Sequence, residues 1–169
     1  CRSTALAQGW QVYAASQGAS NTAKLNSTAA FGADGNFGAA PTSTVFSING
    51  ADHASGYTFV AYLFATCAGV SKVGSYTGNG TSQTINCGFA AGSRFILIKR
   101  TDSTGDWYVW DSARGIVSGN DPHLSLNTTA AEVTTDDSID PDSTGFIVNQ
   151  LSATNINVNS ATYIYFSVA

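Results

Sequence analysis

The sequence is poor in charged residues. Only 11% of its 169 residues are Asp, Glu, Lys or Arg, against roughly 25% in typical soluble domains. Solubility must therefore come from Ser, Thr, Asn and Gly, a composition typical of extracellular or particle-borne β-proteins. The seven basic residues form no cluster, and the net charge is −4. Nucleic-acid binding requires a basic footprint, so we expect no nucleic-acid partner.

Methionine is absent, and so is any long apolar run. The longest apolar run, 59–65, has the length of a strand and is much shorter than the ~18 residues of a membrane span. We therefore expect no membrane insertion. Because no Met is present, we also interpret residue 1 as something other than the start of translation, and we expect a longer parent protein.

An odd number of cysteines, three, argues against a closed disulfide framework. Cys67 and Cys87 flank a stretch in which Asn79-Gly80 predicts a two-residue hairpin turn. A hairpin centred there places Lys72, and not Cys67, opposite Cys87. We therefore expect two buried thiols rather than a disulfide, which fits a chain made in a reducing cytoplasm.

Residues that form catalytic pairs are scarce. Glu132 is the single glutamate, whereas a glycosidase requires two facing carboxylates. The chain has neither a Gly-x-Ser-x-Gly elbow nor a phosphate-binding glycine loop. His53 and His123 have no partner at metal-ligand spacing, and we interpret both as loop histidines. We expect no enzymatic activity and no cofactor.

The chain does contain a tandem repeat. Three landmarks recur in the same order, 97, 101 and 104 residues apart. A repeat this long is a whole β-unit rather than one rung of a solenoid. We therefore expect two units, 1–68 and 69–169. The landmarks are Trp-Gln-Val-Tyr at 10–13 and Trp-Tyr-Val-Trp at 107–110, Leu-Asn motifs at 25–30 and 126–131, and aromatic-rich motifs at 56–65 and 160–169.

The first unit is the shorter copy. In the second unit the Trp motif follows a strong strand candidate at 95–98, which is short, apolar and flanked by charged and turn residues. The first unit has only residues 1–4, which align with 98–101, so it lacks its N-terminal strand. In one interpretation an omitted segment fills this gap. In the other, a neighbouring subunit donates a strand to the edge. The edge residues are Arg2, Ser3 and Thr4.

Short strand candidates separated by turn residues run through both units. This spacing predicts an all-β fold, an antiparallel β-sandwich or jelly roll. The stretch 57–64 has apolar residues on both faces and therefore predicts a central strand. The expected strands are 11–13, 45–48, 57–64, 95–98, 108–110, 124–126, 146–148 and 163–168.

An aromatic strand supplies a candidate glycan-binding site. Tyr108 and Trp110 point to the same side of a strand, and Asp111 and Arg114 follow directly. Aromatic faces with polar neighbours hold sugar rings in β-sandwich lectins. The repeat also allows an architectural role, because Trp110 occupies the position that corresponds to Tyr13.

The acidic stretch 136–142 contains the best candidate for a metal. Asp140, Asp142 and Gly145 have the alternating oxygen spacing and the glycine of calcium loops. The bidentate acid expected at the twelfth position is replaced by Leu151, so the loop is not an EF-hand. The alternative is a loop of turn-forming aspartates.

Together the two units resemble a β-rich repeat domain of unknown function in virion proteins of tailed bacteriophages. The resemblance covers nearly the whole chain, and it is most specific in the central segment. It implies a virion or tail-fibre component and supplies no catalytic residues. The matching segments are 71–80, 98–115, 126–132 and 161–165.

We therefore expect a structural or adhesive module on the surface of a bacteriophage virion, extracellular when it acts. It would assemble with copies of itself or with other virion proteins, since many weak sites on one particle gain avidity. The alternatives are a lectin-like module that binds host-surface glycans, a polysaccharide depolymerase and a subunit of an extracellular filament. Exposed aromatic side chains would favour the lectin, and two carboxylates in one cleft would favour the depolymerase.

Overall fold

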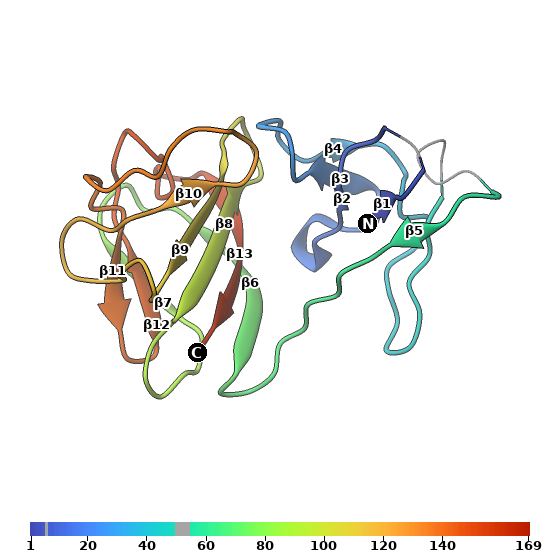
Figure 1. Ribbon diagram of the computed structural model, residues 1–169. Helices are drawn as coiled ribbons and strands as arrows, with labels where there is room; N and C mark the ends of the chain where they lie inside the picture. Colours follow the sequence, from blue (N-terminus) through green and yellow to red (C-terminus); the bar gives the residue numbers. More distant parts are fainter. Residues whose placement is uncertain (6, 50–54) are drawn as a thin grey trace.

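The computed structural model describes residues 1–5, 7–49 and 55–169, so His53 lies outside the described residues. The fold is all-β, as the sequence predicts. Apart from one 3-10 turn, η1 (Ala15–Gln17), the described residues form strands and loops. Figure 1 shows a β-sandwich built by the second part of the chain and, beside it, a smaller set of short strands built by the first part. An extended segment connects the two.

The second unit is an antiparallel β-sandwich. Its larger sheet has five strands in the order β10-β9-β8-β13-β6, and its smaller sheet has three in the order β11-β12-β7. The larger sheet consists of β6 (Ser71–Thr77), β8 (Phe95–Arg100), β9 (Trp107–Asp111), β10 (Leu124–Ser125) and β13 (Thr162–Val168). The smaller sheet consists of β7 (Gln83–Asn86), β11 (Ile139–Asp142) and β12 (Gly145–Val148).

Side-chain alternation along the strands creates the core between these sheets. Ile96 and Ile98 in β8 point inward and are fully buried, as is Trp110 in β9. Phe146 and Val148 in β12 meet them from the opposite sheet and are also fully buried. Burial of each aliphatic or Phe side chain of this kind contributes about 1.5–3 kcal/mol, so the sandwich is the stable body of the chain.

The first unit consists of shorter strands. β1 (Arg2–Ser3) pairs with β5 (Phe59–Val60), and β2 (Gln11–Val12), β3 (Asn21–Lys24) and β4 (Gly32–Ala33) form a three-stranded sheet. Its largest buried side chain is Phe37, whose ring lies 5.6 Å from that of Tyr13. With so little buried apolar surface, this unit has less intrinsic stability than the sandwich.

The first unit repeats the backbone register of the larger sheet. β2 and β3 pair Gln11 with Lys24, and β9 and β10 pair the corresponding Tyr108 with Ser125. Beside each of these pairs, an asparagine side chain accepts a hydrogen bond from the backbone of a tryptophan. Asn26 accepts a hydrogen bond of 3.1 Å from the Trp10 backbone N–H, and Asn127 accepts one of 2.8 Å from that of Trp107.

The N-terminal segment and β5 repeat β8 and β13. Thr4 donates its backbone N–H to the Thr58 carbonyl over 3.0 Å, as Thr101 does to Thr162 over 2.8 Å. The short strands of the first unit are therefore paired in the same way as β8, β9, β10 and β13. Among its described residues, no strand takes the place of β6.

The prediction of a free strand edge at Arg2, Ser3 and Thr4 is wrong. Arg2 and Ser3 pair with Val60 and Phe59, and Thr4 bonds to Thr58. On the other side, the two backbone hydrogen bonds between Cys1 and Gln11 are 2.6 and 2.8 Å long. Even this short segment finds partners, because β5 and β2 lie on either side of it.

The turn at Asn79-Gly80 does not form the predicted hairpin. β6 pairs with β13, whereas β7 pairs with β12 in the other sheet. The chain crosses between sheets here because Asn157 holds the corner: its side-chain oxygen accepts the Asn79 N–H over 3.0 Å, and its carbonyl accepts the Gly80 N–H over 2.8 Å. The expectation that Lys72 lies opposite Cys87 fails with the hairpin.

The three cysteines are free. Cys87 is buried, as expected, and burial raises the pKa of its thiol. Cys67 is exposed, contrary to expectation. It lies in the connection that leads into β6, where its backbone N–H bonds to the Ser71 carbonyl over 2.9 Å.

Candidate functional site

The aromatic strand β9 does not present Trp110 to solvent. Trp110 is fully buried in the core between the sheets, so it has no free face for a sugar ring and that expectation is wrong. Tyr108 points to the same side but is only half-buried, and its hydroxyl donates to the Ala153 carbonyl over 3.4 Å. The smaller sheet and its loops close over the face that the sequence predicted to be open.

Asp111 and Arg114 form a local turn at the end of β9. Asp111 accepts hydrogen bonds of 3.0 Å from the backbone N–H groups of Ala113 and Arg114, and it pairs with the Arg114 guanidinium. Arg114 also pairs with Glu132 over 2.8 Å. These groups satisfy one another, and they lie beyond the buried Trp110 rather than around an exposed aromatic face.

The acidic stretch folds as a strand followed by a tight turn. Asp142 accepts the backbone N–H of Thr144 over 2.8 Å and its hydroxyl over 2.6 Å. Asp140 accepts the Asn149 amide over 2.8 Å and the Gly119 N–H over 3.3 Å. Both carboxylates thus serve as acceptors for nearby loops. The described part of the chain contains no group of three or more His, Cys, Asp or Glu side chains arranged to hold a metal ion.

Asp121 is a buried carboxylate that no motif in the sequence marks. It is fully buried and accepts the backbone N–H groups of Val117 over 3.0 Å and Ile139 over 3.3 Å. Burial raises its pKa to about 6. Its neighbour His123 is also buried, and its ring lies 5.4 Å from that of Trp110. Both residues fix a loop against the core, and the turn signal of Asp121-Pro122 was the only trace of the buried carboxylate in the sequence.

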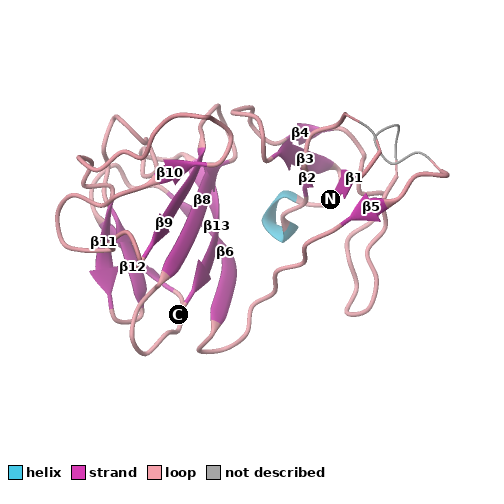
Figure 2. Ribbon diagram, in the orientation of Figure 1, coloured by secondary structure: helices cyan, strands magenta, loops and turns pink. Residues whose placement is uncertain are grey.

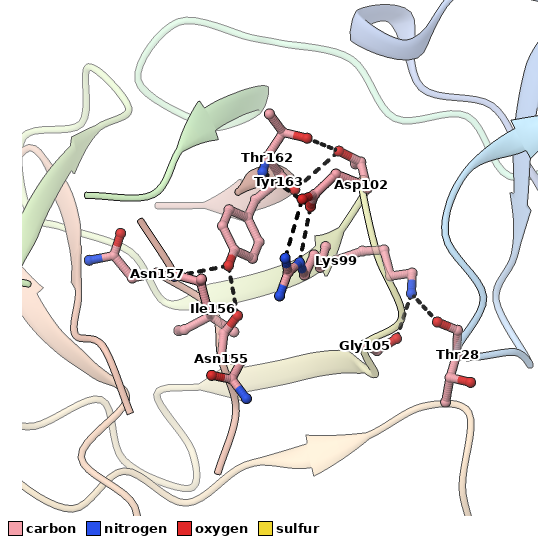
Figure 3. Close-up of polar contacts among 12 residues, drawn as sticks. Thr28, Lys99, Asp102, Gly105, Asn155, Ile156, Asn157, Thr162 and Tyr163 are labelled. Atoms are coloured by element: carbon pink, nitrogen blue, oxygen red, sulfur yellow. Dashed lines mark hydrogen bonds and ion pairs between the residues drawn. The ribbon is translucent and has the colours of Figure 1, made fainter. Parts of the chain in front are cut away.

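The junction between the two units is built by polar contacts to backbone carbonyls. Lys99 is fully buried, and its ammonium group donates to the Thr28 carbonyl of the first unit over 2.9 Å and to the Gly105 carbonyl (Figure 3). Burial lowers the pKa of Lys99 to about 8, against the opposing effect of Asp106. The Trp107 indole N–H donates to the Lys24 carbonyl over 3.0 Å.

An apolar contact accompanies these hydrogen bonds. Side chains on the outer face of the larger sheet pack against small, aliphatic and aromatic side chains of the first unit. Two backbone hydrogen bonds join the units as well, from Phe31 to Thr101 over 3.1 Å and from Gly105 to Thr28 over 2.9 Å. The apolar residues are Leu97, Trp107 and Ile164 in the second unit and Val12, Ala14, Ala23, Leu25 and Phe31 in the first.

The loops above the sheet are held by β13. The Tyr163 hydroxyl donates to the Asn155 carbonyl over 2.7 Å and accepts the Val158 N–H over 3.0 Å (Figure 3). The neighbouring Thr162 N–H donates to Asp102 over 3.3 Å. A polar cavity of about 510 Å³ lies beside these loops, and Tyr108, Arg100, Asp106, Asn155 and Thr28 are among its lining residues.

An apolar segment follows β5 and is exposed. Tyr62, Leu63 and Phe64 are 68%, 75% and 62% exposed, and the segment runs as an extended loop between the two units (Figure 2). Two of these rings touch neighbours: Tyr62 lies 5.6 Å from Trp10, and Phe64 lies 4.6 Å from Phe166. The sequence predicted a central strand here, but only β5 forms a ladder.

A family model matches the chain over residues 1–169. The chain belongs to the family described as "Domain of unknown function (DUF7483)". Neither the curated proteins nor the solved structures contain a match to this DUF7483 chain. Across the described residues, no helix has the length and apolar character needed to cross a membrane.

Proposed function

We propose that this DUF7483 chain is a non-enzymatic structural or adhesive module of a bacteriophage virion, as a tail-fibre or particle-surface protein. It assembles through β-sheet contacts with copies of itself or with other virion proteins. The virion assignment rests on the resemblance of segments such as 98–115 to virion repeat domains. The mode of assembly rests on the way the two units associate.

The docking of one unit on the outer sheet face of the other is the observation that supports this function. Trp107, Lys99 and Ile164 form a surface that recognises backbone carbonyls and aliphatic side chains of a related unit. Recognition of this kind requires a folded β-unit as partner and no bound small molecule. A low-charge exterior suits such contacts, because few charged groups must lose water when two surfaces meet.

Immunogold electron microscopy of purified phage particles tests this function. An antibody raised against residues 1–169 should label the particles, and antibody pre-absorbed with the purified chain should not. Label at fibre tips would support host attachment, and label along a tube or over the capsid would support a structural role. Unlabelled particles from a phage that encodes the chain would overturn the assignment.

Glycan binding is a second candidate, favoured by the polar cavity at the junction. Tyr108 supplies an aromatic edge there, and Asp106, Arg100 and Asn155 supply polar groups. Thr104 lines this cavity, so a Thr104→Trp variant places a bulky ring in it, whereas Thr129→Trp places the same side chain on an exposed loop elsewhere. On a glycan array, signal lost only in Thr104→Trp would support this candidate. Equal signals in both variants would exclude the cavity as the binding site.

A further inference from the structure

The second unit shows what covers the last strand of this fold. β13 lies between β6 and β8 and pairs with both along its length. Its side chains Ile164 and Tyr165 are 9% and 5% exposed, because the first unit covers one face of the sheet and the smaller sheet covers the other. The corresponding residues of the first unit are Val60 and Ala61, and the chain then continues through Tyr62, Leu63 and Phe64.

In the first unit, the segment that corresponds to β13 has few paired strands beside it. Val60 pairs with Arg2, but residues 61–64 have no ladder partner among the residues that the structure describes. Val60 is 38% exposed, and the three side chains after Ala61 are each more than 60% exposed. In Figure 1, β5 lies next to β1, and among the residues that the structure describes no second strand pairs with it. An extended apolar segment in this state is a template for strand addition.

The direction of the backbone groups identifies the open edge. The Thr58 carbonyl accepts from Thr4 and therefore faces β1. Backbone groups alternate between the two edges of a strand, so those of Val60 and Tyr62 face the same way, and those of Ala61 and Leu63 face the other way. The second unit confirms this alternation, because Ala161 and Ala169 bond to Gly78 and Val70, the residues that flank β6. Ala61 and Leu63 thus face the side where a β6-type strand belongs.

We propose that residues 60–64 accept a β6-type strand from a polypeptide other than this chain, as an antiparallel neighbour on the edge formed by Ala61 and Leu63. A second copy is not the donor, because its own β6 already pairs with β13 along its length. This inference rests on the proposed assembly through β-sheet contacts and names its partner. The donor is an extended segment with the pattern of Ser71–Thr77. In the register of β6 on β13, the residue equivalent to Ser75 lies opposite Val60, and the residue equivalent to Ser71 lies opposite Phe64.

One position distinguishes this edge from that of β13. Gly74 lies opposite Tyr165, and a Cβ atom there would come within 2.5 Å of the Tyr165 ring. The first unit has Ala61 in place of Tyr165, so the donor residue opposite Ala61 is free to carry a side chain. A β-branched residue at that position also favours the extended conformation. The first unit therefore accepts donors that β13 rejects.

A labelled peptide tests the proposal on the complete 169-residue chain. The probe is a fluorescein-labelled peptide with the sequence of Ser71–Thr77 in which Gly74 is replaced by Val, so that it does not compete for β13. We expect saturable binding in fluorescence anisotropy. Leu63→Pro removes an N–H group on the proposed edge and should weaken binding by about tenfold or more. Tyr62→Pro removes an N–H group on the opposite edge and is the matched control, so it should bind nearly as the parent chain does.

Circular dichroism melts of both proline variants establish that the sandwich is intact. No saturable binding to the folded parent chain would overturn the proposal, as would equal loss of binding in the two proline variants. A chain that dimerises in light scattering through this edge would also overturn it, because the occupant would then be a second copy. Peptide binding without labelling of particles would support this edge and overturn the virion assignment. Labelling of particles without peptide binding would overturn this edge and leave the virion assignment standing.

Discussion

The indole nitrogen of Trp107 donates a hydrogen bond of 3.0 Å to the backbone carbonyl of Lys24, and this contact joins the two units. The matching residue of the first unit, Trp10, also has a cation beside its ring. The Arg2 guanidinium lies 5.9 Å from the centre of the Trp10 ring, and the Lys99 ammonium lies 5.9 Å from that of Trp107. One structural motif therefore occurs twice, and in the second unit it recognises the backbone of a neighbour.

Replacing Trp107 with Phe should loosen the junction. The variant loses the hydrogen bond to Lys24, which is worth about 1–2 kcal/mol with the accompanying loss of packing. Backbone amides in β3 should exchange with deuterium about tenfold faster, while those in β8 and β13 keep their protection. Trp110→Phe is the control, because it removes a buried indole that contacts only the second unit's core. Unchanged exchange in β3 of the Trp107→Phe variant would show that the junction does not depend on this contact.

The two asparagines test whether the repeat has the same physical basis in both units. Asn127→Ala leaves the part-buried backbone N–H of Trp107 without its acceptor, and we expect a loss of about 1–2 kcal/mol in chemical denaturation. Asn26→Ala should cost less, because its bond to Trp10 is exposed and water replaces it. A larger loss from Asn26→Ala than from Asn127→Ala would contradict this account.

Gly145 is required by the close approach of two strands. A Cβ atom there would collide with the carbonyl oxygen of Ile85 in the neighbouring strand β7. Gly145→Ala should therefore destabilise the sandwich by about 1–3 kcal/mol, since the backbone must shift to relieve the overlap. Gly32→Ala is the matched control, because nothing lies within 4 Å of a Cβ at that position. Equal denaturation midpoints for the two variants would argue against the pairing of β12 with β7.

The buried Lys99 predicts a specific pH dependence. Its pKa is about 8 in the folded chain, below its ordinary value of 10.5, because burial disfavours the charged ammonium. Between these values the unfolded chain binds more protons at this site than the folded chain. The contribution of Lys99 to the free energy of unfolding therefore rises as the pH increases from about 8 towards 10.

Denaturation of the parent chain and of Lys99→Met at pH 7.5, 8.5 and 9.5 measures this contribution. Other groups, such as the buried Cys87 thiol with its raised pKa, titrate in both proteins, so their effects cancel in the difference. The parent chain should gain stability relative to Lys99→Met as the pH rises. A constant difference between the two proteins would show that Lys99 has an ordinary pKa.

Local apolar patterns were sufficient to predict the central strands of the larger sheet. Residues 95–98 and 163–168 lie within β8 and β13, which have many buried side chains and a paired strand on each side. The repeat predicted the correspondence of Trp10 with Trp107, which the matching hydrogen bonds of Asn26 and Asn127 now explain. Where side chains pack in the same way, the sequence pattern and the structure agree.

Predictions failed where distant partners decide the local structure. Residues 45–48 were expected to form a strand but form a loop, in which the Val45 carbonyl accepts the Thr42 N–H over 2.8 Å. Conversely, the aspartates at 140 and 142 predict a turn, whereas this segment forms strand β11. The pairing of β11 with β12 outweighs the low strand propensity of these aspartates. In the candidate glycan site, the burial of Trp110 depends on β7 and β12, which no local pattern around Trp110 indicates.

The pairing of β6 with β13 determines how the second unit responds to a pulling force. The chain enters at Ser71 and leaves at Val168, and these two residues lie opposite each other at one end of an antiparallel ladder. Tension applied through the two ends therefore opens this ladder one pair at a time, as a zipper opens, instead of shearing all its hydrogen bonds together. Under such tension, the unit would extend at low force and absorb mechanical work.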